Sequence, residues 1–169
     1  MKTESKFKLM SNNSWGELYT PREAVEMIVP YIPKNVQTIW ECTAIDDSKI
    51  VDELNHNYYN VIKSHIKDGY DFFEYQPENY DMIITNPPYK YKNEFLERAF
   101  ELNKPFMFLL PLTTLEGKKR GDLFRKHKIQ VLIPNKRFNF LEKKSGAWFQ
   151  TSWFCYKCNL NNDLNFINI

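Results

Sequence analysis

Short apolar runs alternate with amphipathic segments along most of the chain. The apolar runs are rich in β-branched and aromatic residues and predict buried strands at 36–40, 58–64, 82–84, 105–112 and 129–134. The segments between them place apolar residues on one helical face and predict helices at 20–31, 48–56, 93–102 and 115–127. Alternating strands and helices are typical of an α/β fold with a doubly wound, mostly parallel sheet. Such a sheet binds ligands beyond the carboxyl ends of its strands.

Local signals refine this outline at three places. The first helix has the features of a helix start, with Thr20 as N-cap, Pro21 at the first helical position and Glu23 two residues later. The stretch 65–80 is too short for a helix and a strand, so one crossover of the usual fold is missing. Residues 147–157 alternate in hydrophobicity and predict an antiparallel edge strand that closes the sheet.

The chain is predicted to form a single domain. A length of 169 residues is enough to bury a sizeable core, and neither a repeat nor a linker divides the sequence. We expect the domain to span residues 16–158, with a flexible arm at 1–15 and a C-terminal tail at 159–169.

Composition and charge narrow the function only a little. A net charge of +2 neither demands nor excludes nucleic acid, and an aromatic content of 16% can serve core packing or base stacking. Three cysteines without a spaced framework indicate reduced thiols and a cytoplasmic setting. No run approaches 18 apolar residues, so we expect neither export nor membrane insertion.

The most informative stretch is Asn86-Pro87-Pro88-Tyr89, which directly follows the buried run 82–84. Two prolines cannot continue a strand ladder, so the strand must become a stiff loop at Asn86. The loop then presents an amide, a carbonyl and a phenol at the carboxyl end of a buried strand. The alternative is a plain strand-to-turn transition, because Asn-Pro is a common turn signal.

With this tetrapeptide at a strand end, the chain resembles the S-adenosylmethionine (SAM)-dependent adenine-N6 methyltransferases of DNA, whose signature is (D/N/S)PP(Y/F/W). The resemblance covers about residues 18–157 in family order: "YTP" at 19–21, "IWECTAIDD" at 39–47, "DFF" at 71–73, the tetrapeptide, and "FLLPLTTLEG" at 108–117. It implies a Rossmann-like class I methyltransferase fold, SAM as cofactor and DNA as the nucleic-acid partner. The small size is similar to that of phage or prophage members without a target recognition domain.

The resemblance also implies roles in catalysis for the four residues. The exocyclic amine of adenine is a poor nucleophile, because its lone pair is delocalised into the ring. The side-chain oxygen of Asn86 and the carbonyl of Pro87 would accept its two N–H groups and favour a pyramidal amine. Pro88 would stiffen the loop, and Tyr89 would offer an aromatic face to a base that has left its stack.

The cofactor site is where the sequence departs from the family. The residues that the resemblance assigns to SAM are Tyr19, Thr20, Pro21, Glu41, Thr43, His65 and Asp71. The two glycines that usually turn the cofactor loop are replaced by Ile45 and Asp47, so either the loop turns differently or SAM binds poorly. His65 stands where the family has an acid for the ribose hydroxyls, and a partly exposed loop histidine is the plain alternative. Asp71 could equally cap a turn.

Three further features of the sequence have possible functional roles. The run Lys118-Lys119-Arg120 follows a strand carboxyl end and could contact phosphates, although charge runs are usually solvated faces. Cys155 and Cys158 form a lone C-x-x-C, and a strand would send them to opposite faces, so we expect no metal site. The aromatic residues of 148–154 are expected to pack the closing strand.

Two functional hypotheses follow from the sequence. The first is an adenine-N6 methyltransferase. The second is a catalytically degenerate protein of the same fold that binds nucleic acid or acts as an accessory or decoy subunit. The replaced glycines favour the second, and the intact tetrapeptide favours the first. Because the family usually carries a recognition domain after the core, we expect low specificity, single-stranded or RNA targets, or a protein partner that supplies specificity.

Overall fold

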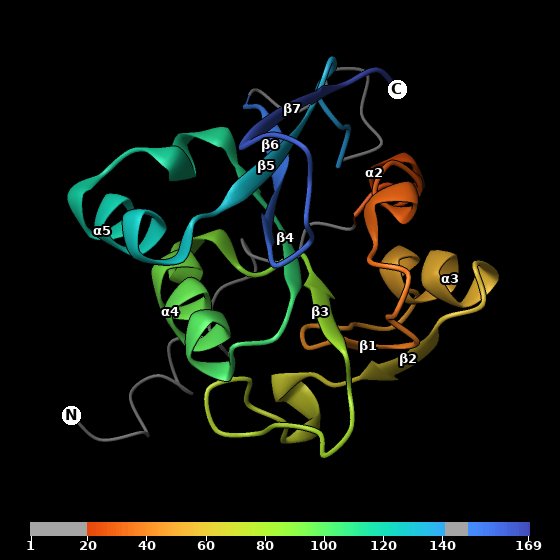
Figure 1. Ribbon diagram of the computed structural model, residues 1–169. Helices are drawn as coiled ribbons and strands as arrows, with labels where there is room; N and C mark the ends of the chain where they lie inside the picture. Colours follow the sequence, from red (N-terminus) through yellow and green to blue (C-terminus); the bar gives the residue numbers. More distant parts are fainter. Residues whose placement is uncertain (1–19, 141–148) are drawn as a thin grey trace.

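The computed structural model describes residues 20–140 and 149–169, and these form a mixed α/β domain around one twisted sheet (Figure 1). The sheet has seven strands in the order β2-β1-β3-β4-β6-β5-β7. The strands are β1 (Thr38–Glu41), β2 (Asn60–Lys63), β3 (Met82–Thr85), β4 (Phe106–Pro111), β5 (Gln130–Pro134), β6 (Thr151–Tyr156) and β7 (Leu164–Ile167). The predicted fold class is confirmed, and each predicted strand is present.

Strands β2, β1, β3 and β4 are parallel, and β6 is antiparallel to both of its neighbours, β4 and β5. The predicted antiparallel strand is therefore present, but it does not form the edge. Five of its six residues are buried, as in a strand with neighbours on both sides. The edge beyond it is completed by β5 and β7.

Strand β7 corrects the expectation of a tail at 159–169. Its residues Leu164–Ile167 pair in parallel with Val131–Pro134 of β5. Only four residues take part, and two of them, Leu164 and Phe166, remain exposed. A short segment with one exposed face carries little hydrophobic signal, and for this reason it resembled a tail.

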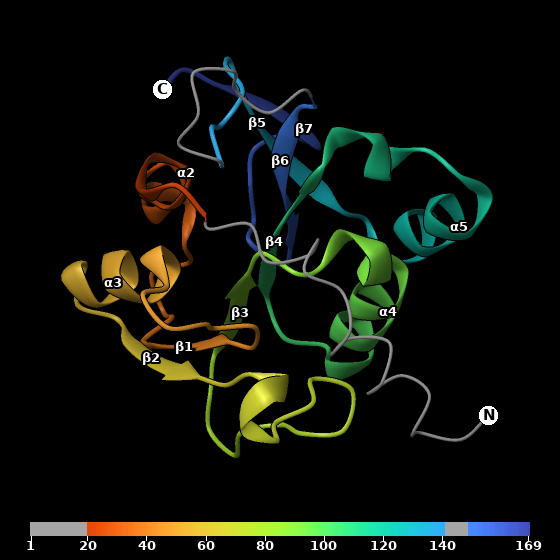
Figure 2. The same ribbon diagram turned by 180° about the vertical axis from the view of Figure 1, so that it is seen from behind.

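Helices cover both faces of the sheet (Figures 1 and 2). One face carries α2 (Arg22–Glu26), η1 (Val29–Tyr31) and α3 (Lys49–His56), and the other carries η3 (Tyr89–Tyr91), α4 (Lys92–Leu102), η4 (Leu112–Leu115) and α5 (Lys118–His127). Adjacent residues of β3 pack against the helices on opposite faces of the sheet, because side chains alternate along a strand. Ile84 packs in the core cluster with Val25 and Leu54, whereas Ile83 packs in the cluster with Phe95 and Phe108.

The first helix is shorter than predicted and is not capped by Thr20. It ends at Glu26, and Pro21 precedes it at the N-cap position without a side-chain cap bond. Pro30 explains the early end, because proline has no N–H to donate and disfavours helical geometry in the residue before it. The hydroxyl of Thr20 is instead a partner of Asn86.

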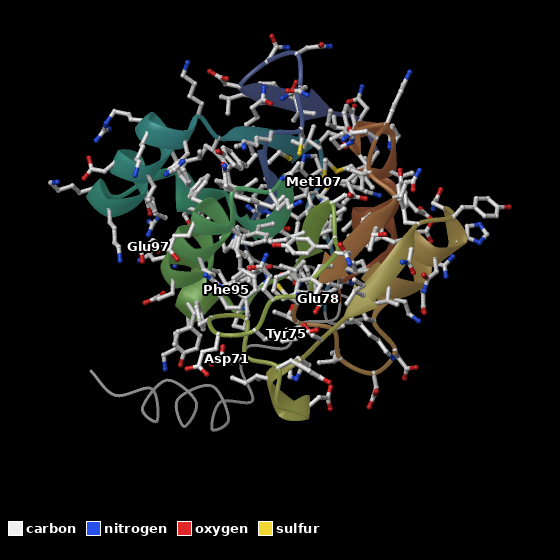
Figure 3. The ribbon with its side chains drawn as sticks, turned by 60° about the horizontal axis from the view of Figure 1, so that its bottom comes forward. Asp71, Tyr75, Glu78, Phe95, Glu97 and Met107 are labelled. Carbon is white, nitrogen blue, oxygen red and sulfur yellow. The ribbon has the colours of Figure 1, made fainter. Side chains whose placement is uncertain are left out.

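The missing crossover is confirmed. Between β2 and β3 the chain forms only the short 3-10 helix η2 (Ile66–Asp68) and loops. This segment, with Asp71 and Tyr75 labelled in Figure 3, lies beside Phe95 of α4. Phe72 stacks on Phe95 with ring centroids 4.7 Å apart and an angle of 6° between the rings. Aromatic packing therefore replaces the absent helix. No helix in the described part of the chain could cross a membrane.

Candidate functional site

The candidate site lies where the chain direction across the sheet reverses. From β1 the chain continues to β2 on one side, and β3 then pairs with β1 on the other side. In open α/β sheets, this reversal leaves a crevice at the carboxyl ends of the two central strands. Glu41 ends β1, and Asn86 directly follows β3. The fold thus brings together the two residues that the sequence assigned to the cofactor and to catalysis.

The loop that begins at Asn86 is fixed on both sides. The Nδ2 atom of Asn86 donates to Oγ1 of Thr20 at 3.1 Å, and the backbone N–H of Tyr91 donates to the carbonyl of Pro88 at 2.9 Å. The bond to Thr20 engages the nitrogen of the amide rather than its oxygen, and the oxygen is buried. This orientation agrees with a role of Asn86 as an acceptor.

Tyr89 lies at the start of η3 and is half-buried. Its ring meets Phe149 edge-to-face, with centroids 5.9 Å apart. Its hydroxyl is buried without a hydrogen-bond partner among the described residues, and burial raises the pKa of Tyr89 well above its usual range. The sequence had assigned Phe149 to packing alone, so its position beside the tetrapeptide was missed. A local pattern does not show this contact between residues 60 positions apart.

Glu41 is the centre of a buried hydrogen-bond network. Its Oε1 atom accepts from the hydroxyl of Thr85 at 2.5 Å and from the backbone N–H of Thr43 at 2.9 Å, and the hydroxyl oxygen of Thr43 lies 3.2 Å away. Its Oε2 atom accepts a longer bond of 3.3 Å from Ser48. Only 2% of the residue is exposed. A buried carboxylate needs such donors, because losing water otherwise costs several kcal/mol.

The burial of Glu41 predicts a pH-dependent stability. Burial raises the pKa of Glu41 above its ordinary value of 4.5, and the bonds from Thr85, Thr43 and Ser48 only partly oppose this. Between the ordinary and the raised pKa, the folded protein keeps a proton that the unfolded chain has lost. The contribution of Glu41 to stability therefore falls as the pH rises through this window.

Replacing Glu41 with glutamine should remove this contribution. The free energy of unfolding of Glu41→Gln, measured by urea titration, should fall less steeply than that of the parent as the pH rises from about 4.5. Parallel curves for the two proteins would show that Glu41 ionises alike in the folded and unfolded chain.

The cofactor loop turns without the usual glycines. Asp47 adopts the left-handed conformation at φ 60°, which aspartate tolerates better than most residues. Ile45 is not among the residues with positive φ, so its branched side chain meets no such strain. Its carbonyl accepts the N–H of Ser48, and the hydroxyl of Ser48 then caps α3. A different turn of this loop is one of the two alternatives considered from the sequence, and the backbone angles agree with it.

His65 and Asp71 are each engaged with nearby backbone. Nδ1 of the buried His65 accepts the N–H of Lys67 at 3.0 Å and caps η2, and Oδ1 of Asp71 accepts the N–H of Phe73 at 2.9 Å. The contact of Asp71 matches the turn-capping alternative considered from the sequence, whereas His65 lies in a loop but is buried rather than partly exposed. The half-buried Pro21 precedes α2, and Tyr19 lies outside the described residues.

The donors and acceptors at the end of β1 suit one end of SAM. An ammonium group needs acceptor oxygens, and within the described residues Oε2 of Glu41 accepts only the long bond from Ser48. Because a carboxylate oxygen can accept two bonds, Glu41 has capacity for one more donor. The residues around Glu41 therefore fit the amino-acid end of the cofactor. Of the two residues that the resemblance assigns to the adenosyl part of SAM, His65 for the ribose and Asp71 near the adenine, each has an acceptor already engaged with the backbone.

The predicted phosphate-binding run forms the first turn of α5, and each of its side chains has a partner within the protein. The two lysine side chains are exposed, at 91% for Lys118 and 57% for Lys119, whereas Arg120 is half-buried. The partners are Asp122 for Lys118, Glu97 for Lys119, and Asn93 and the carbonyl of Thr114 for Arg120. Arg120 thus joins α5 to α4 and η4, while the lysines remain accessible to a polyanion.

Removing the three cations should weaken nucleic-acid binding independently of sequence. If all three meet phosphates, replacing Lys118, Lys119 and Arg120 with alanine should flatten the slope of log K against log salt by up to about three. The double variant with alanine at Lys118 and Lys119 retains Arg120, which joins α5 to its neighbours. It should flatten the same slope by up to about two. An unchanged slope in fluorescence-anisotropy titrations would leave the run as a solvated face.

Cys155 and Cys158 lie in the same core cluster, contrary to the expectation of opposite faces. Strand β6 ends at Tyr156, and Lys157 adopts a left-handed φ of 54°, which turns Cys158 back toward the core. The strand periodicity used for the expectation therefore ends two residues before Cys158 and does not apply to it. Both thiols are buried, and burial raises the pKa of Cys155.

Comparison with known proteins places the fold. No protein-family model and no curated protein matches the sequence. Among solved structures, the chain is similar to a type I restriction-modification methyltransferase subunit from Streptococcus thermophilus, at 17% identity and a TM-score of 0.61 over 90% of this chain and 47% of that one. A modification subunit assigned to a type I restriction enzyme of Vibrio vulnificus gives 11% identity and a TM-score of 0.55, with coverages of 98% and 50%.

A third similar structure identifies the fold class. It is a protein from Listeria monocytogenes assigned to the class I SAM-dependent methyltransferases, at 12% identity and a TM-score of 0.52 over 96% of this chain and 69% of that one. The chain has the Rossmann-like fold of class I methyltransferases. Within this fold, it spans about half the length of the two restriction-modification subunits.

Proposed function

We propose that the protein is a SAM-dependent methyltransferase that acts on the N6 amine of adenine in nucleic acid, with DNA as the favoured polymer. The observation that carries the proposal is the placement of Asn86 and Glu41 at neighbouring strand ends of a class I methyltransferase fold. One similar structure is a methyltransferase subunit of a type I restriction-modification system and another is a modification subunit assigned to a type I restriction enzyme, which supports a nucleic-acid substrate.

The tetrapeptide would activate the amine by accepting its hydrogens. The orientation of the Asn86 amide, fixed by Thr20, presents an oxygen acceptor, and the carbonyl of Pro87 lies next to it in the chain. Two acceptors on the two N–H groups favour a nucleophilic nitrogen, and no strong base is required. Tyr89 would bind the flipped base by its ring.

SAM supplies the methyl group as an electrophile when bound. Glu41 would hold the ammonium end of SAM, and Thr43 lies next to Glu41. Thr20, which is hydrogen-bonded to Asn86, and the adjacent Pro21 would lie between the cofactor and the tetrapeptide. His65 and Asp71 would contact the adenosyl end, and their existing backbone bonds limit what they can add. Tyr19 completes the set that the resemblance assigns to the cofactor.

Binding of SAM, or of its demethylated product, is expected to be weak. An imidazole at position 65 cannot replace the paired bonds of a ribose-binding carboxylate, and such a loss is worth roughly 1–3 kcal/mol. We expect a dissociation constant of tens of micromolar or more, measured by isothermal titration calorimetry. Absence of both heat and thermal shift at millimolar ligand would exclude cofactor binding.

A second function is favoured by one specific observation. Acceptors of Glu41, His65 and Asp71 already bind the protein's own donors, as expected for a protein that has lost its cofactor. Such a protein would keep the base site and bind nucleic acid as an accessory or decoy subunit, with a protein partner that supplies sequence specificity. Binding of a polymer without any methyl transfer to DNA or RNA would select this function.

A further inference from the structure

The backbone ladder between the two central strands ends before the candidate site. Strands β1 and β3 are paired at Ile39 with Met82 and at Trp40 with Ile83. No paired residues follow these within the described ladder, although β1 continues to Glu41 and β3 to Thr85. Beyond Trp40, the ends of these strands therefore need another connection.

Three side chains provide this connection. The hydroxyl of Thr85 donates to Oε1 of Glu41 at 2.5 Å, and the hydroxyls of Thr43 and Thr85 lie 2.6 Å apart. Thr43 also reaches the backbone carbonyl of Asn86, at 3.4 Å. Thr85 is completely buried, so its hydroxyl cannot exchange these partners for water.

Thr85 occupies the decisive position in this chain of bonds. It directly precedes Asn86, and a hydroxyl has one hydrogen, which Thr85 gives to Glu41. Thr43 therefore supplies the hydrogen between the two hydroxyls. A donor that binds Oε2 of Glu41 draws charge away from Oε1, the atom that accepts from Thr85, and the loop at Asn86 is attached directly to Thr85.

We propose that Thr85 is a positioning residue that couples the occupancy of Glu41 to the position of the Asn86 loop. The inference rests on the proposed function only in naming the occupant, the ammonium end of SAM. The coupling itself belongs to the ligand-free protein. By reciprocity, a base held by Asn86 would change the affinity of the Glu41 site by the same factor.

Hydrogen exchange of the ligand-free full chain, followed by mass spectrometry, tests the coupling. Peptides that cover 41–48 and 86–92 report the two loops. Thr85→Val removes the hydroxyl and should accelerate exchange about tenfold in both peptides, which is the worth of one bond to a charged group. Thr85→Ser keeps the hydroxyl and should stay within about twofold of the parent.

Two further variants separate coupling from general loosening. Glu41→Gln should accelerate exchange in the 86–92 peptide, although Glu41 lies outside it. Thr151→Val is the matched control, because Thr151 is also fully buried on a strand but its hydroxyl has no partner among the described residues. It should leave both peptides unchanged. Equal exchange of the 86–92 peptide in Glu41→Gln and parent would overturn the proposal, as would equal effects of Thr85→Val and Thr151→Val.

A second arm distinguishes this proposal from the proposed function. Saturating S-adenosylhomocysteine should change exchange of the 86–92 peptide in the parent and not in Thr85→Val. If the parent binds no such ligand, the cofactor assignment fails, while the ligand-free variants still decide whether the two loops are coupled. If the parent binds the ligand and Thr85→Val responds identically, the coupling is absent and the proposed function stands.

Discussion

Replacing Asn86 with alanine is expected to reduce methyl transfer by a hundredfold or more while leaving the fold intact. The side chain lies outside the hydrophobic core and donates to Thr20, so its removal should cost about 1–3 kcal/mol of stability and leave the protein folded. An acceptor that acts on the transition state is worth roughly 3–4 kcal/mol. The measurement is transfer of tritiated methyl groups to DNA and to RNA, with the circular dichroism spectrum as the test of folding.

Two companion variants sharpen this result. Asn86→Asp should be milder than Asn86→Ala, because aspartate keeps an acceptor oxygen and family members that the chain resembles carry it at this position. Tyr89→Ala should mainly weaken binding of the flipped base, by about 1–3 kcal/mol. If the parent transfers methyl groups and Asn86→Ala transfers them equally well, the role assigned to the tetrapeptide is wrong.

Replacing Phe95 with alanine is expected to lower the free energy of unfolding by about 3–5 kcal/mol. Phe95 is fully buried on α4 and touches three other aromatic rings, those of Phe72, Phe73 and Phe108, with centroids 4.7, 5.1 and 6.4 Å away. Two of these rings belong to the segment that replaces the missing crossover (Figure 3). Loss of the ring would leave a cavity and release the loop that carries Asp71.

The matched control is Phe95→Leu, which keeps most of the volume and should cost less than half as much. Urea denaturation followed by circular dichroism measures both variants. A loss below about 1 kcal/mol for Phe95→Ala would show that the segment 65–80 does not depend on this aromatic packing.

Much of the fold could be predicted because its elements have strong local signals. Every residue of Met82–Thr85 is buried, and its unbroken apolar run predicts a central strand. The helix ending at Leu102 shows clear amphipathic spacing. The first helix was overextended because a good N-terminal signal at Thr20 outweighed Pro30, which lies inside the predicted span. Strand β7 was missed because four residues with one exposed face have no distinctive pattern.

The candidate site could be predicted only where one stretch of sequence carries it. Asn86 was found because it directly follows a recognisable strand, and Glu41 because the family resemblance assigns it to the cofactor. The hydroxyl network was not found, because Thr43 and Thr85 are 42 positions apart and a local pattern does not show that their side chains meet. The same holds for the bond from Asn86 to Thr20, which spans 66 positions. Such contacts depend on how the strands are ordered in the sheet.

The most direct test of the proposed function is incubation of the unmodified protein with labelled SAM and unmethylated DNA, followed by mass spectrometry of the released nucleosides. The account predicts labelled N6-methyladenine, at a rate that depends on Asn86. Binding of nucleic acid with no methylated base in DNA or in RNA, at cofactor concentrations well above the expected dissociation constant, would contradict it and establish a nucleic-acid-binding protein of the same fold.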